Sequence, residues 1–445
     1  MKEGAKYLVK IEDLGHAGEG VGRVDGLVVF VPGVLPGEEV EVEITQVSRK
    51  YARGIPSSIH TKSPQRVAPE CDLHGLCGGC QLQHLSYPSQ LAYKEKLVAN
   101  ALKRIGGLNV PLLPIVPAPN PWNYRTKIQS PVGVKGKEIV TGFFARGTHD
   151  IVPTDSCLIQ HPLNNLVLRT IRELIMKYGL SVYDEDSGQG DLRHVIVRVG
   201  EGEALVTLVT RREQVPHLRE LAAELMDSLP SVAGVVQNIN PARTNVILGR
   251  KTIPLAGQDY LIVSLDGIKF KVSPMAFLQV NWEQTKALYR IVRDFAQLTG
   301  RERLVDAYCG IGTIALYLAP WAGEVYGIEE VPEAVEDAVF NSTLNNLPAA
   351  FICGLVEEEL ARLAKEGPID VLVMDPPRKG CHPRVIETIR SASINRIVYV
   401  SCNPGTLARD LGMLKEYEIL AVQPVDMFPQ THHVETVVLM SREKD

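Results

Sequence analysis

The chain has 445 residues, a formal net charge of −5, 45% hydrophobic and 22% charged residues, which is enough length for two to four domains with the composition of an ordinary soluble protein. Apolar runs such as Leu27 to Val31 are far shorter than the ~18 residues that cross a bilayer, and residues 1–6 lead into no signal-peptide core. We therefore expect a cytoplasmic protein without a membrane partner, whose eight cysteines are thiols or ligands rather than disulfides.

Residues 1–58 are predicted to form a small all-β unit. The segments 7–12, 26–31 and 39–44 alternate or run apolar, and glycine-rich turns separate them. Short strands at this spacing favour an OB-like barrel, a common platform for single-stranded nucleic acid.

Three short patterns in this unit resemble a known RNA-binding domain. They are Gly18-Glu-Gly, Val-Phe-Val-Pro-Gly at 29–33 and Leu-Pro-Gly-Glu-Glu-Val at 35–40. Together they resemble the TRAM domain, which is an appendage of RNA-modifying enzymes. The resemblance implies an RNA partner.

The charge distribution also bears on the partner. The net charge argues weakly against nucleic acid, but the segment 46–66 holds basic residues and no acidic ones: Arg49, Lys50, Arg53, Lys62 and Arg66. A segregated basic patch can attract phosphates although the average charge is negative. A solvated surface segment is the alternative.

Residues 59–272 are predicted to form a mixed α+β domain that carries a cysteine site. Its part 90–121 is a candidate to pack on the C-terminal domain instead. The expected elements are helices at 87–105, 162–178 and 216–228 and strands at 141–144, 194–199 and 204–209.

Residues 273–445 are predicted to form an α/β, Rossmann-like domain, so the chain as a whole is multidomain. Helical and strand patterns alternate, with parallel strands expected at 304–305, 324–328, 370–374 and 396–400. Open sheets of this kind bind ligands at the carboxyl ends of their strands.

A glycine turn marks a nucleotide-type cofactor site. Gly310-Ile-Gly312 follows one strand and precedes an apolar helix, and Glu329 ends the next strand, where an acid suits ribose hydroxyls. The third glycine of a dinucleotide fingerprint is absent. With Asp375-Pro-Pro, the pattern resembles class I S-adenosylmethionine-dependent methyltransferases that act on nucleobases.

The residue after the two prolines separates subclasses of these enzymes. Adenine-N6 methyltransferases have an aromatic residue there and RNA cytosine-5 methyltransferases place a cysteine in the motif, whereas this chain has Arg378. Uracil C5 chemistry remains, with the nucleophile elsewhere.

Cys402 is the candidate nucleophile because it follows a buried-strand pattern that stops at 401–404, Ser-Cys-Asn-Pro. Uracil C5 is a poor nucleophile until a thiolate adds to C6. A free thiol of pKa ~8.5 is only slightly ionised at neutral pH, so we expect the surroundings of Cys402 to lower its pKa. Packing is the favoured role for the rivals Cys309 and Cys353, and Cys381 stays an open alternative.

Glu435 is the candidate base, since it opens a final apolar strand in which a charge is out of place. His433 is the rival, although a lone histidine near a strand start is more often a hydrogen-bonded scaffold residue. Loss of the base is expected to cost ~10²–10⁴ in rate.

Segments 401–404 and 407–410 are similar to the nucleophile motif of the RNA uracil-5-methyltransferase family, 433–435 to its base motif, and 273–281 to the entry of its catalytic domain. The likeness covers nearly the whole chain. It implies that the following residues contact S-adenosylmethionine or the reacting base: Gln279, Tyr308, Glu329 and Asp375. It also implies that Phe277 lies beside the uracil. At Leu355 the chain lacks the acid or amide that often binds the adenine.

A cysteine motif, Cys71-x₅-Cys77-x₂-Cys80, needs a fourth ligand, for which Cys157 is the candidate. Four thiolates suit zinc or an iron–sulfur cluster, and only one Cys-x₂-Cys pair is present. The ribosomal-RNA branch of the family carries a 4Fe–4S cluster on this pattern, so the resemblance implies one. Radical S-adenosylmethionine enzymes have a different spacing, Cys-x₃-Cys-x₂-Cys.

The expected function is therefore S-adenosylmethionine-dependent methylation of uracil C5 in RNA. The TRAM-like unit with a cluster favours large-subunit (23S) ribosomal RNA over transfer RNA. The target uridine must be flipped or in a loop, because a thiol cannot reach C6 within a stacked helix. A non-catalytic iron–sulfur RNA-binding factor and a redox-sensing cluster protein are the alternatives.

Overall fold

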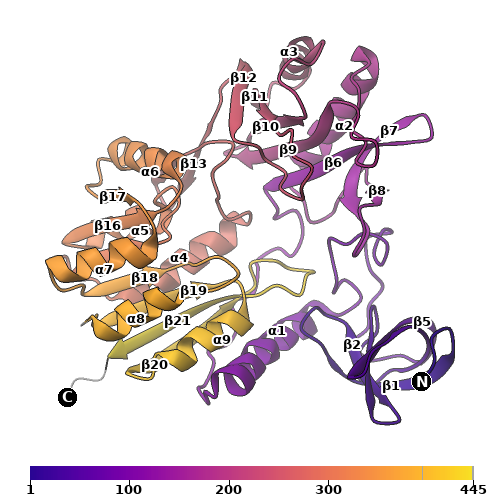
Figure 1. Ribbon diagram of the computed structural model, residues 1–445, viewed down its shortest axis with the longest axis horizontal. Coiled ribbons are helices and arrows are strands. Elements are labelled where there is room, and N and C mark those ends of the chain that lie inside the picture. Colours follow the sequence, from indigo (N-terminus) through magenta and orange to yellow (C-terminus); the bar gives the residue numbers. More distant parts are fainter. Residues whose placement is uncertain (393, 443–445) are drawn as a thin grey trace.

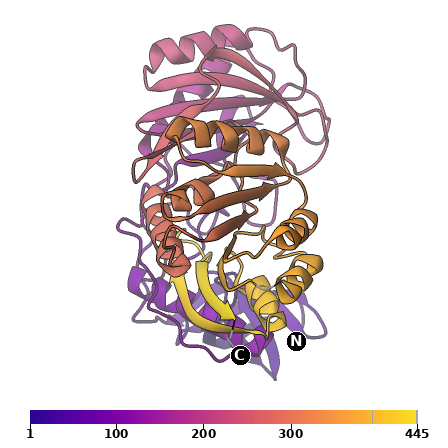
Figure 2. The ribbon, with the colours of Figure 1, turned by 90° about the vertical axis from the view of Figure 1, so that its left-hand side faces the viewer.

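The computed structural model describes residues 1–392 and 394–442, and within them no helix has the length and apolar character to cross a membrane. The described residues form an N-terminal barrel, a central sheet and a C-terminal sheet flanked by helices. In Figure 2 the central sheet lies above the C-terminal sheet, and the barrel lies behind the lower part of the molecule.

The barrel is closed, and this confirms the OB-like prediction. Its strands are β1 (Lys6–Leu14), β2 (Gly20–Val24), β3 (Leu27–Val31), β4 (Glu39–Val47) and β5 (Tyr51–Thr61). They follow the order β1-β2-β3-β5-β4, and β1 closes on β4. Along β4, Val40, Val42 and Ile44 face the core. Glycine is needed at Gly54, since a Cβ there would lie 2.7 Å from the Glu43 carbonyl oxygen.

A long helix connects the barrel side of the molecule to the C-terminal domain (Figure 1). Helix α1 (Tyr87–Ala101) continues as a π-helical turn, Leu102–Gly106, which ends at Gly107 with a φ of 66°. The helix packs against α9 and β20 of the C-terminal domain. Beyond it, Val116 forms a parallel bridge with Val425, so the segment after α1 extends the edge of the C-terminal sheet.

The central sheet has the order β12-β11-β10-β9-β6-β7-β8. Its strands are β6 (Lys127–Lys135), β7 (Glu138–Phe144), β8 (Ile151–Pro153), β9 (Leu192–Gly200), β10 (Glu203–Thr210), β11 (Val232–Ile239) and β12 (Lys251–Gly257). Helices α2 (Pro162–Tyr178) and α3 (Leu218–Ser228) cover one face through an aliphatic core. The hairpin β13 (Leu261–Leu265) and β14 (Ile268–Val272) packs on the C-terminal core instead.

The C-terminal sheet has the order β17-β16-β15-β18-β19-β21-β20. The first five strands and β20 run in one direction, and β21 lies antiparallel between β19 and β20. Its strands are β15 (Arg303–Ala307), β16 (Glu324–Glu329), β17 (Ala350–Cys353), β18 (Val371–Met374), β19 (Arg396–Ser401), β20 (Tyr417–Val425) and β21 (Glu435–Arg442). Its helices are α4 (Trp282–Ala296), α5 (Thr313–Leu318), α6 (Pro332–Asn345), α7 (Val356–Glu366), α8 (Pro383–Ser391) and α9 (Pro404–Met413). The strand order reverses at β15, where such sheets bind ligands.

Candidate active site

The glycine turn after β15 is tightly constrained. Tyr308, Gly310 and Gly312 have φ angles of 67°, 55° and 79°, a backbone that glycine adopts freely and that strains a tyrosine. A Cβ at Gly312 would lie 2.8 Å from the Phe351 ring, whereas a Cβ at Gly310 would meet no atom within 4 Å. The turn therefore leaves open space at Gly310, beside the start of α5.

Five of the predicted cofactor or substrate residues line one cavity beside this turn: Phe277, Gln279, Tyr308, Gly310 and Asp375. The predicted Glu329 lies behind the turn. Its two carboxylate oxygens accept hydrogen bonds from the backbone N–H groups of Gly310 (3.0 Å) and Val331 (2.9 Å). Each oxygen keeps a second lone pair, so Glu329 both holds the turn and can accept another hydrogen bond.

Asp306 also lines this cavity, although sequence reasoning had not selected it as a site residue. One of its carboxylate oxygens accepts a hydrogen bond from Ala315 N–H at 2.8 Å, and the other has no partner among the described residues. Burial, together with the charges of Asp375 and Glu329, raises the pKa of Asp306 well above its usual range. Its place at the end of β15 was the signal available in the sequence.

The loop that carries Cys402 is held by local hydrogen bonds. Asn403 caps α9, because its Oδ1 accepts a hydrogen bond from Gly405 N–H at 3.0 Å. Asn403 Nδ2 donates to the carbonyl oxygen of Arg378 at 3.1 Å, and Thr406 Oγ1 donates to the same oxygen at 3.2 Å. These bonds join the loop after β19 to the Asp-Pro-Pro-Arg loop after β18. Cys402 is half-buried between them.

The prediction that the surroundings lower the pKa of Cys402 is wrong for this structure. Burial, with the charges of Glu435 and Asp375, raises the pKa of Cys402 to about 11, and Arg378 opposes this effect only in part. Two carboxyl groups close to a thiol disfavour a further negative charge. Ionisation of Cys402 therefore requires added positive charge or protonated carboxyl groups nearby.

Glu435 is the first residue of β21, beside the nucleophile strand. The register places Thr436 opposite Ser401 of β19, so Glu435 lies next to the loop that carries Cys402. Glu435 is only 2% exposed, and its Oε2 has no partner among the described residues. Burial raises the pKa values of both Glu435 and Asp375, and the charge of Asp375 raises that of Glu435 further. The two acids and the thiol thus converge at neighbouring strand ends.

The rival nucleophiles and the rival base occupy different surroundings. Cys309 is buried, as predicted, whereas the packing role predicted for Cys353 is wrong, because Cys353 is exposed at the end of the edge strand β17. Cys381 is buried with its Sγ 3.6 Å from the Tyr399 hydroxyl, and its pKa is raised to about 12. Burial lowers the pKa of His433 to about 3, so this ring is neutral.

The four predicted ligand cysteines, Cys71, Cys77, Cys80 and Cys157, line one cavity of about 370 Å³. Burial and the neighbouring thiols raise the pKa values of Cys80 to about 12 and of Cys157 to about 11. The Cys77 sulfur accepts a hydrogen bond from Gly79 N–H at 3.3 Å. Within residues 1–392 and 394–442, no three His, Cys, Asp or Glu side chains are close enough to hold a single metal ion.

This cysteine cavity opens toward the candidate active site. Its wall also contains Phe277, Gln279, Arg378 and His433. Phe277 is 70% exposed, so its ring is free to contact a ligand. Phe277 and Gln279 line both the cysteine cavity and the cofactor cavity, so the two cavities adjoin each other at these residues.

A second cavity, of about 650 Å³, lies between the barrel and the C-terminal domain. Phe30 of the barrel, Arg104 of the π-helical turn and Cys402 all line it, and it shares Arg378 and His433 with the cysteine cavity. Arg53 stacks near the rings of Phe30 and Tyr51. An aromatic and basic surface therefore leads from the barrel to the candidate nucleophile.

The basic segment 46–66 is only partly available for such a surface. Arg66 donates hydrogen bonds to both carboxylate oxygens of Glu38, at 2.6 and 2.7 Å, and to the Gly33 carbonyl. Glu38 is fully buried, so Arg66 neutralises a buried charge. The structure assigns Arg66 to the barrel itself.

Comparisons with known proteins find family matches at both ends of this chain. Residues 1–56 match the family model described as TRAM domain, and residues 197–443 match the one described as tRNA (Uracil-5-)-methyltransferase. An uncharacterized RNA methyltransferase of Bacillus cereus is 48% identical over 441 residues, which cover 98% of this chain and 96% of the relative. Another, from Caldanaerobacter subterraneus, is 46% identical over 448 residues, 99% of each chain.

A solved structure is similar over the full length. It is the Pyrococcus abyssi tRNA (uracil-54, C5)-methyltransferase in complex with S-adenosyl-L-homocysteine, with 30% sequence identity, a TM-score of 0.80, and coverage of 97% of this chain and 99% of that chain. The chain therefore belongs to the tRNA (uracil-5-)-methyltransferase family and is a TRAM-containing, S-adenosylmethionine-dependent RNA (uracil-5-)-methyltransferase.

Proposed function

We propose that this enzyme forms 5-methyluridine in large-subunit (23S) ribosomal RNA, with Cys402 as nucleophile and Glu435 as base. The observation that carries the residue roles is the convergence of Cys402, Asp375 and Glu435 at the ends of three adjacent strands. A nucleophile, a base and a cofactor cavity within one edge of the sheet are what the reaction requires.

In the proposed reaction, the Cys402 thiolate adds to C6 of the uracil, and the electron pair of the C5–C6 double bond moves toward C5 and O4. The C5 carbon then takes the methyl group of S-adenosylmethionine, which leaves S-adenosylhomocysteine. Glu435, as carboxylate, removes the C5 proton. The electron pair of the C5–H bond re-forms the C5–C6 double bond. The C6–S bond breaks at the same time, and its electron pair returns to sulfur as the Cys402 thiolate.

The raised pKa of Cys402 fits a reaction in which S-adenosylmethionine binds before the thiolate forms. The nearby carboxyl groups disfavour the thiolate, and their own pKa values are raised, so in part of the molecules they are protonated. A sulfonium cation in the adjacent cavity would favour the thiolate by simple Coulomb attraction. Nucleophile activation would thus depend on a loaded cofactor cavity.

We assign cofactor contacts to Gln279, Tyr308, Gly310, Glu329 and Asp375, and uracil contacts to Phe277 and Asp375. Their common cavity supports this assignment for all except Glu329, which would act from behind the glycine turn. Asp306 and Thr313 line the same cavity. Leu355 lies just before α7. Because its side chain has no hydrogen-bonding group, the polar contact to the adenine must come from another residue.

We infer that the target uridine enters between the barrel and the C-terminal domain. This path corresponds to a proposed division into three domains. Residues 1–58 bind RNA, residues 59–272 carry the cysteine site and residues 273–445 carry out catalysis. Phe30, Tyr51 and Arg53 would supply stacking, and Arg104 would supply charge to phosphates. A flipped base is required, since Cys402 is half-buried at the bottom of this path.

We propose that Cys71, Cys77, Cys80 and Cys157 hold a 4Fe–4S cluster. The donor set fits: four half-buried thiols share one cavity, and a backbone N–H donates to the Cys77 sulfur, as is common around such clusters. Four thiolates also suit zinc, which is the second candidate for this site.

The cluster assignment is tested by iron and sulfide analysis of anaerobically purified protein. Four iron and four sulfide per chain, lost in Cys80→Ser, would support it. Zinc in place of iron would contradict it. When bound, a cluster would cross-link the loop 71–80 to Cys157, and we assign it no step in methyl transfer.

The RNA target is tested by nucleoside mass spectrometry on unmethylated large-subunit ribosomal RNA and transfer RNA, each incubated with the enzyme and S-adenosylmethionine. Transfer RNA is the second candidate, because the Pyrococcus abyssi relative that matches nearly the whole chain acts on it. 5-Methyluridine in ribosomal RNA alone supports the proposal, and 5-methyluridine in transfer RNA alone overturns the choice of target.

A further inference from the structure

The segment 426–434, here called the base loop, joins β20 to β21 and ends directly before Glu435. It carries His433 and Phe428, which line the cysteine cavity. Gln430 has a φ of 69°, so the loop turns through a conformation that costs free energy for a residue with a side chain. Contacts from outside the loop must therefore hold it.

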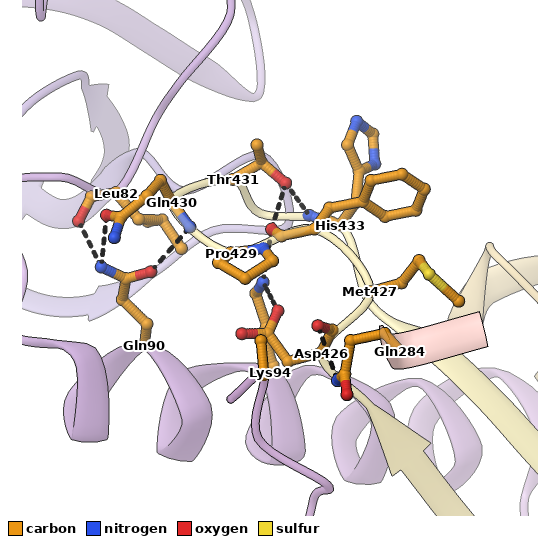
Figure 3. Close-up of polar contacts among 12 residues, drawn as sticks. Leu82, Gln90, Lys94, Gln284, Asp426, Met427, Pro429, Gln430, Thr431 and His433 are labelled. Atoms are coloured by element: carbon orange, nitrogen blue, oxygen red, sulfur yellow. Dashed lines mark hydrogen bonds and ion pairs between the residues drawn. The ribbon is translucent and has the colours of Figure 1, made fainter. Parts of the chain in front are cut away.

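One face of α1 supplies such contacts (Figure 3). Gln90 and Lys94 lie one turn apart on this helix and point toward the base loop. The Gln90 amide donates to Gln430 Oε1 at 2.9 Å and accepts from Gln430 N–H at 3.0 Å. The Lys94 ammonium donates to Asp426 Oδ1 at 2.5 Å and to the Phe428 carbonyl at 2.9 Å.

Lys94 and Asp426 are an ion pair without any exposed side-chain surface. Burial lowers the pKa of Lys94, and Asp426 opposes this shift. Tyr87 donates to the second oxygen of Asp426 at 2.8 Å. A buried ion pair of this kind contributes little net stability compared with an apolar pair, but it accepts only one geometry. Its value here is therefore in the position it gives the loop.

Other segments complete the attachment of the base loop. The Gln430 carbonyl accepts hydrogen bonds from Gln81 N–H and Leu82 N–H, at 3.1 and 3.0 Å. Three further bonds come from side chains outside the loop: Tyr124 to the Pro429 carbonyl, Asn281 to the Met427 carbonyl and Gln284 to the Asp426 carbonyl. Gln81 and Leu82 directly follow Cys80, so the cysteine site also touches this loop.

We propose that Lys94 and Gln90 are positioning residues for Glu435 and therefore act on removal of the C5 proton. The inference rests on the proposed role of Glu435. The Glu435 carboxyl has no partner on Oε2 among the described residues. The orientation of this carboxyl therefore depends on where the base loop places the start of β21. The rate of proton transfer falls steeply when the donor and the acceptor are misplaced relative to each other.

Helix α1 also packs against α9, but the hydrogen bonds of Lys94 and Gln90 do not reach the loop of Cys402. Neither Lys94 nor Gln90 forms a hydrogen bond to the segment 401–406 within the described residues, and that segment is held by Arg378 and by its own side chains. Variants of the α1 face should thus separate two steps of one reaction. Methyl transfer should continue while release of the product slows.

The experiment uses RNA labelled with tritium at uridine C5, with S-adenosylmethionine in a single turnover. Lys94→Met combined with Asp426→Asn leaves no unpaired buried charge, and Asn can still accept from Tyr87. Gln90→Met is the second variant. Lys96→Met is the matched control, since Lys96 lies on the same helix, is exposed and pairs with Asp13. Thermal unfolding of each variant shows that it is folded.

In the double variant and in Gln90→Met, we expect methyl incorporation to change less than ~3-fold, tritium release to slow at least ~10-fold and a methylated covalent protein–RNA adduct to accumulate on a denaturing gel. Equal slowing of both steps, or no slowing of either, in a folded double variant or in folded Gln90→Met overturns the inference. Selective slowing of tritium release in the control Lys96→Met overturns it as well.

Glu435→Gln measured alongside separates the two claims. An adduct in Glu435→Gln but not in the α1 variants overturns the positioning role alone. Absence of an adduct from Glu435→Gln overturns the assignment of the base, and the positioning role falls with it.

Discussion

The loops that present the proposed nucleophile, Cys402, and the proposed base, Glu435, are held in different ways. The Cys402 loop is fixed by bonds within the segment 401–406 and to the neighbouring Arg378 carbonyl. The base loop is fixed by residues as distant in sequence as Lys94 and Gln90. A nucleophile can therefore be specified by a short motif, whereas the aim of the base depends on the assembly of the whole chain.

This difference corresponds to two demands of the reaction. The nucleophile has to reach C6 and then leave it, and a strand end with a capped helix gives a small, rigid support. The base has to approach C5 only after the methyl group has arrived. A loop attached to α1 connects that late step to the helix that follows the cysteine motif 71–80 (Figure 1).

The largest expected effect is that of the nucleophile. Cys402→Ala should lower methyl transfer by at least ~10³-fold, because no covalent adduct can form and C5 stays unreactive. RNA binding should remain, since the barrel and its cleft are unchanged. Incorporation of labelled methyl groups into unmethylated RNA measures the effect. Activity within tenfold of the wild type would make Cys402 a packing residue.

The base comes next. Glu435→Gln should lower turnover by ~10²–10⁴-fold and trap a methylated protein–RNA adduct, because the glutamine cannot take the C5 proton. The adduct is detected by denaturing electrophoresis. His433→Asn serves as the matched control, and a trapped adduct in this variant but not in Glu435→Gln would transfer the role of base to His433.

The pH dependence of turnover tests both loops together, and we expect an effect of intermediate size. Glu435 and Asp375 have raised pKa values, so the basic form of Glu435 appears only as the pH rises through its raised value. Cys402, with a pKa of about 11, also ionises more as the pH increases. Turnover should therefore rise several-fold between about pH 6 and pH 9. A rate that falls over this range would contradict the role of Glu435 as base.

The same raised values predict the sign of a stability effect. An acid whose pKa is higher in the folded chain binds its proton more tightly there than in the unfolded chain. The contribution of Glu435 and Asp375 to stability is thus greatest below their unfolded pKa values and is lost as the pH rises through the raised ones. Denaturant unfolding at several pH values, with Glu435→Gln as reference, measures this trend.

The smallest expected effect concerns the barrel. Arg66→Ala should lower stability by about 2 kcal/mol, because it leaves the buried Glu38 carboxylate without its cation. It should not alter the salt dependence of RNA binding. Arg53→Ala should do the reverse, since Arg53 is stacked on the exposed side of Phe30 and Tyr51. A weaker salt dependence in Arg66→Ala would make Arg66 a phosphate ligand.

Much of the candidate site could be predicted because its signals are local. Glycines at 310 and 312, Asp375 after β18 and Cys402 after β19 each follow a strand pattern, and parallel strands bring their ends together. The OB-like barrel was predictable for the same reason, since its strands alternate between turns. By contrast, the packing role predicted for Cys353 was wrong, because β17 is an edge strand whose end is exposed.

The electrostatics could not be predicted from the sequence. The pKa of Cys402 depends on Glu435 and Asp375, which are distant in sequence and buried beside it. Arg66 is one of several basic residues in its segment, and only the fold pairs it with Glu38. Charge counts treat such residues alike, whereas burial and partners decide what each one does.

By itself, the sequence determined most of the elements and the candidate residues for the chemistry, because strand and helix periods, glycine turns and a strand-end cysteine are local properties. Only the tertiary structure decided that Lys94 meets Asp426, that the cysteine cavity adjoins Phe277, and that Glu435 is buried beside Cys402. The physical reason is that these contacts join different segments of the chain, and their energies depend on a burial that exists only after folding.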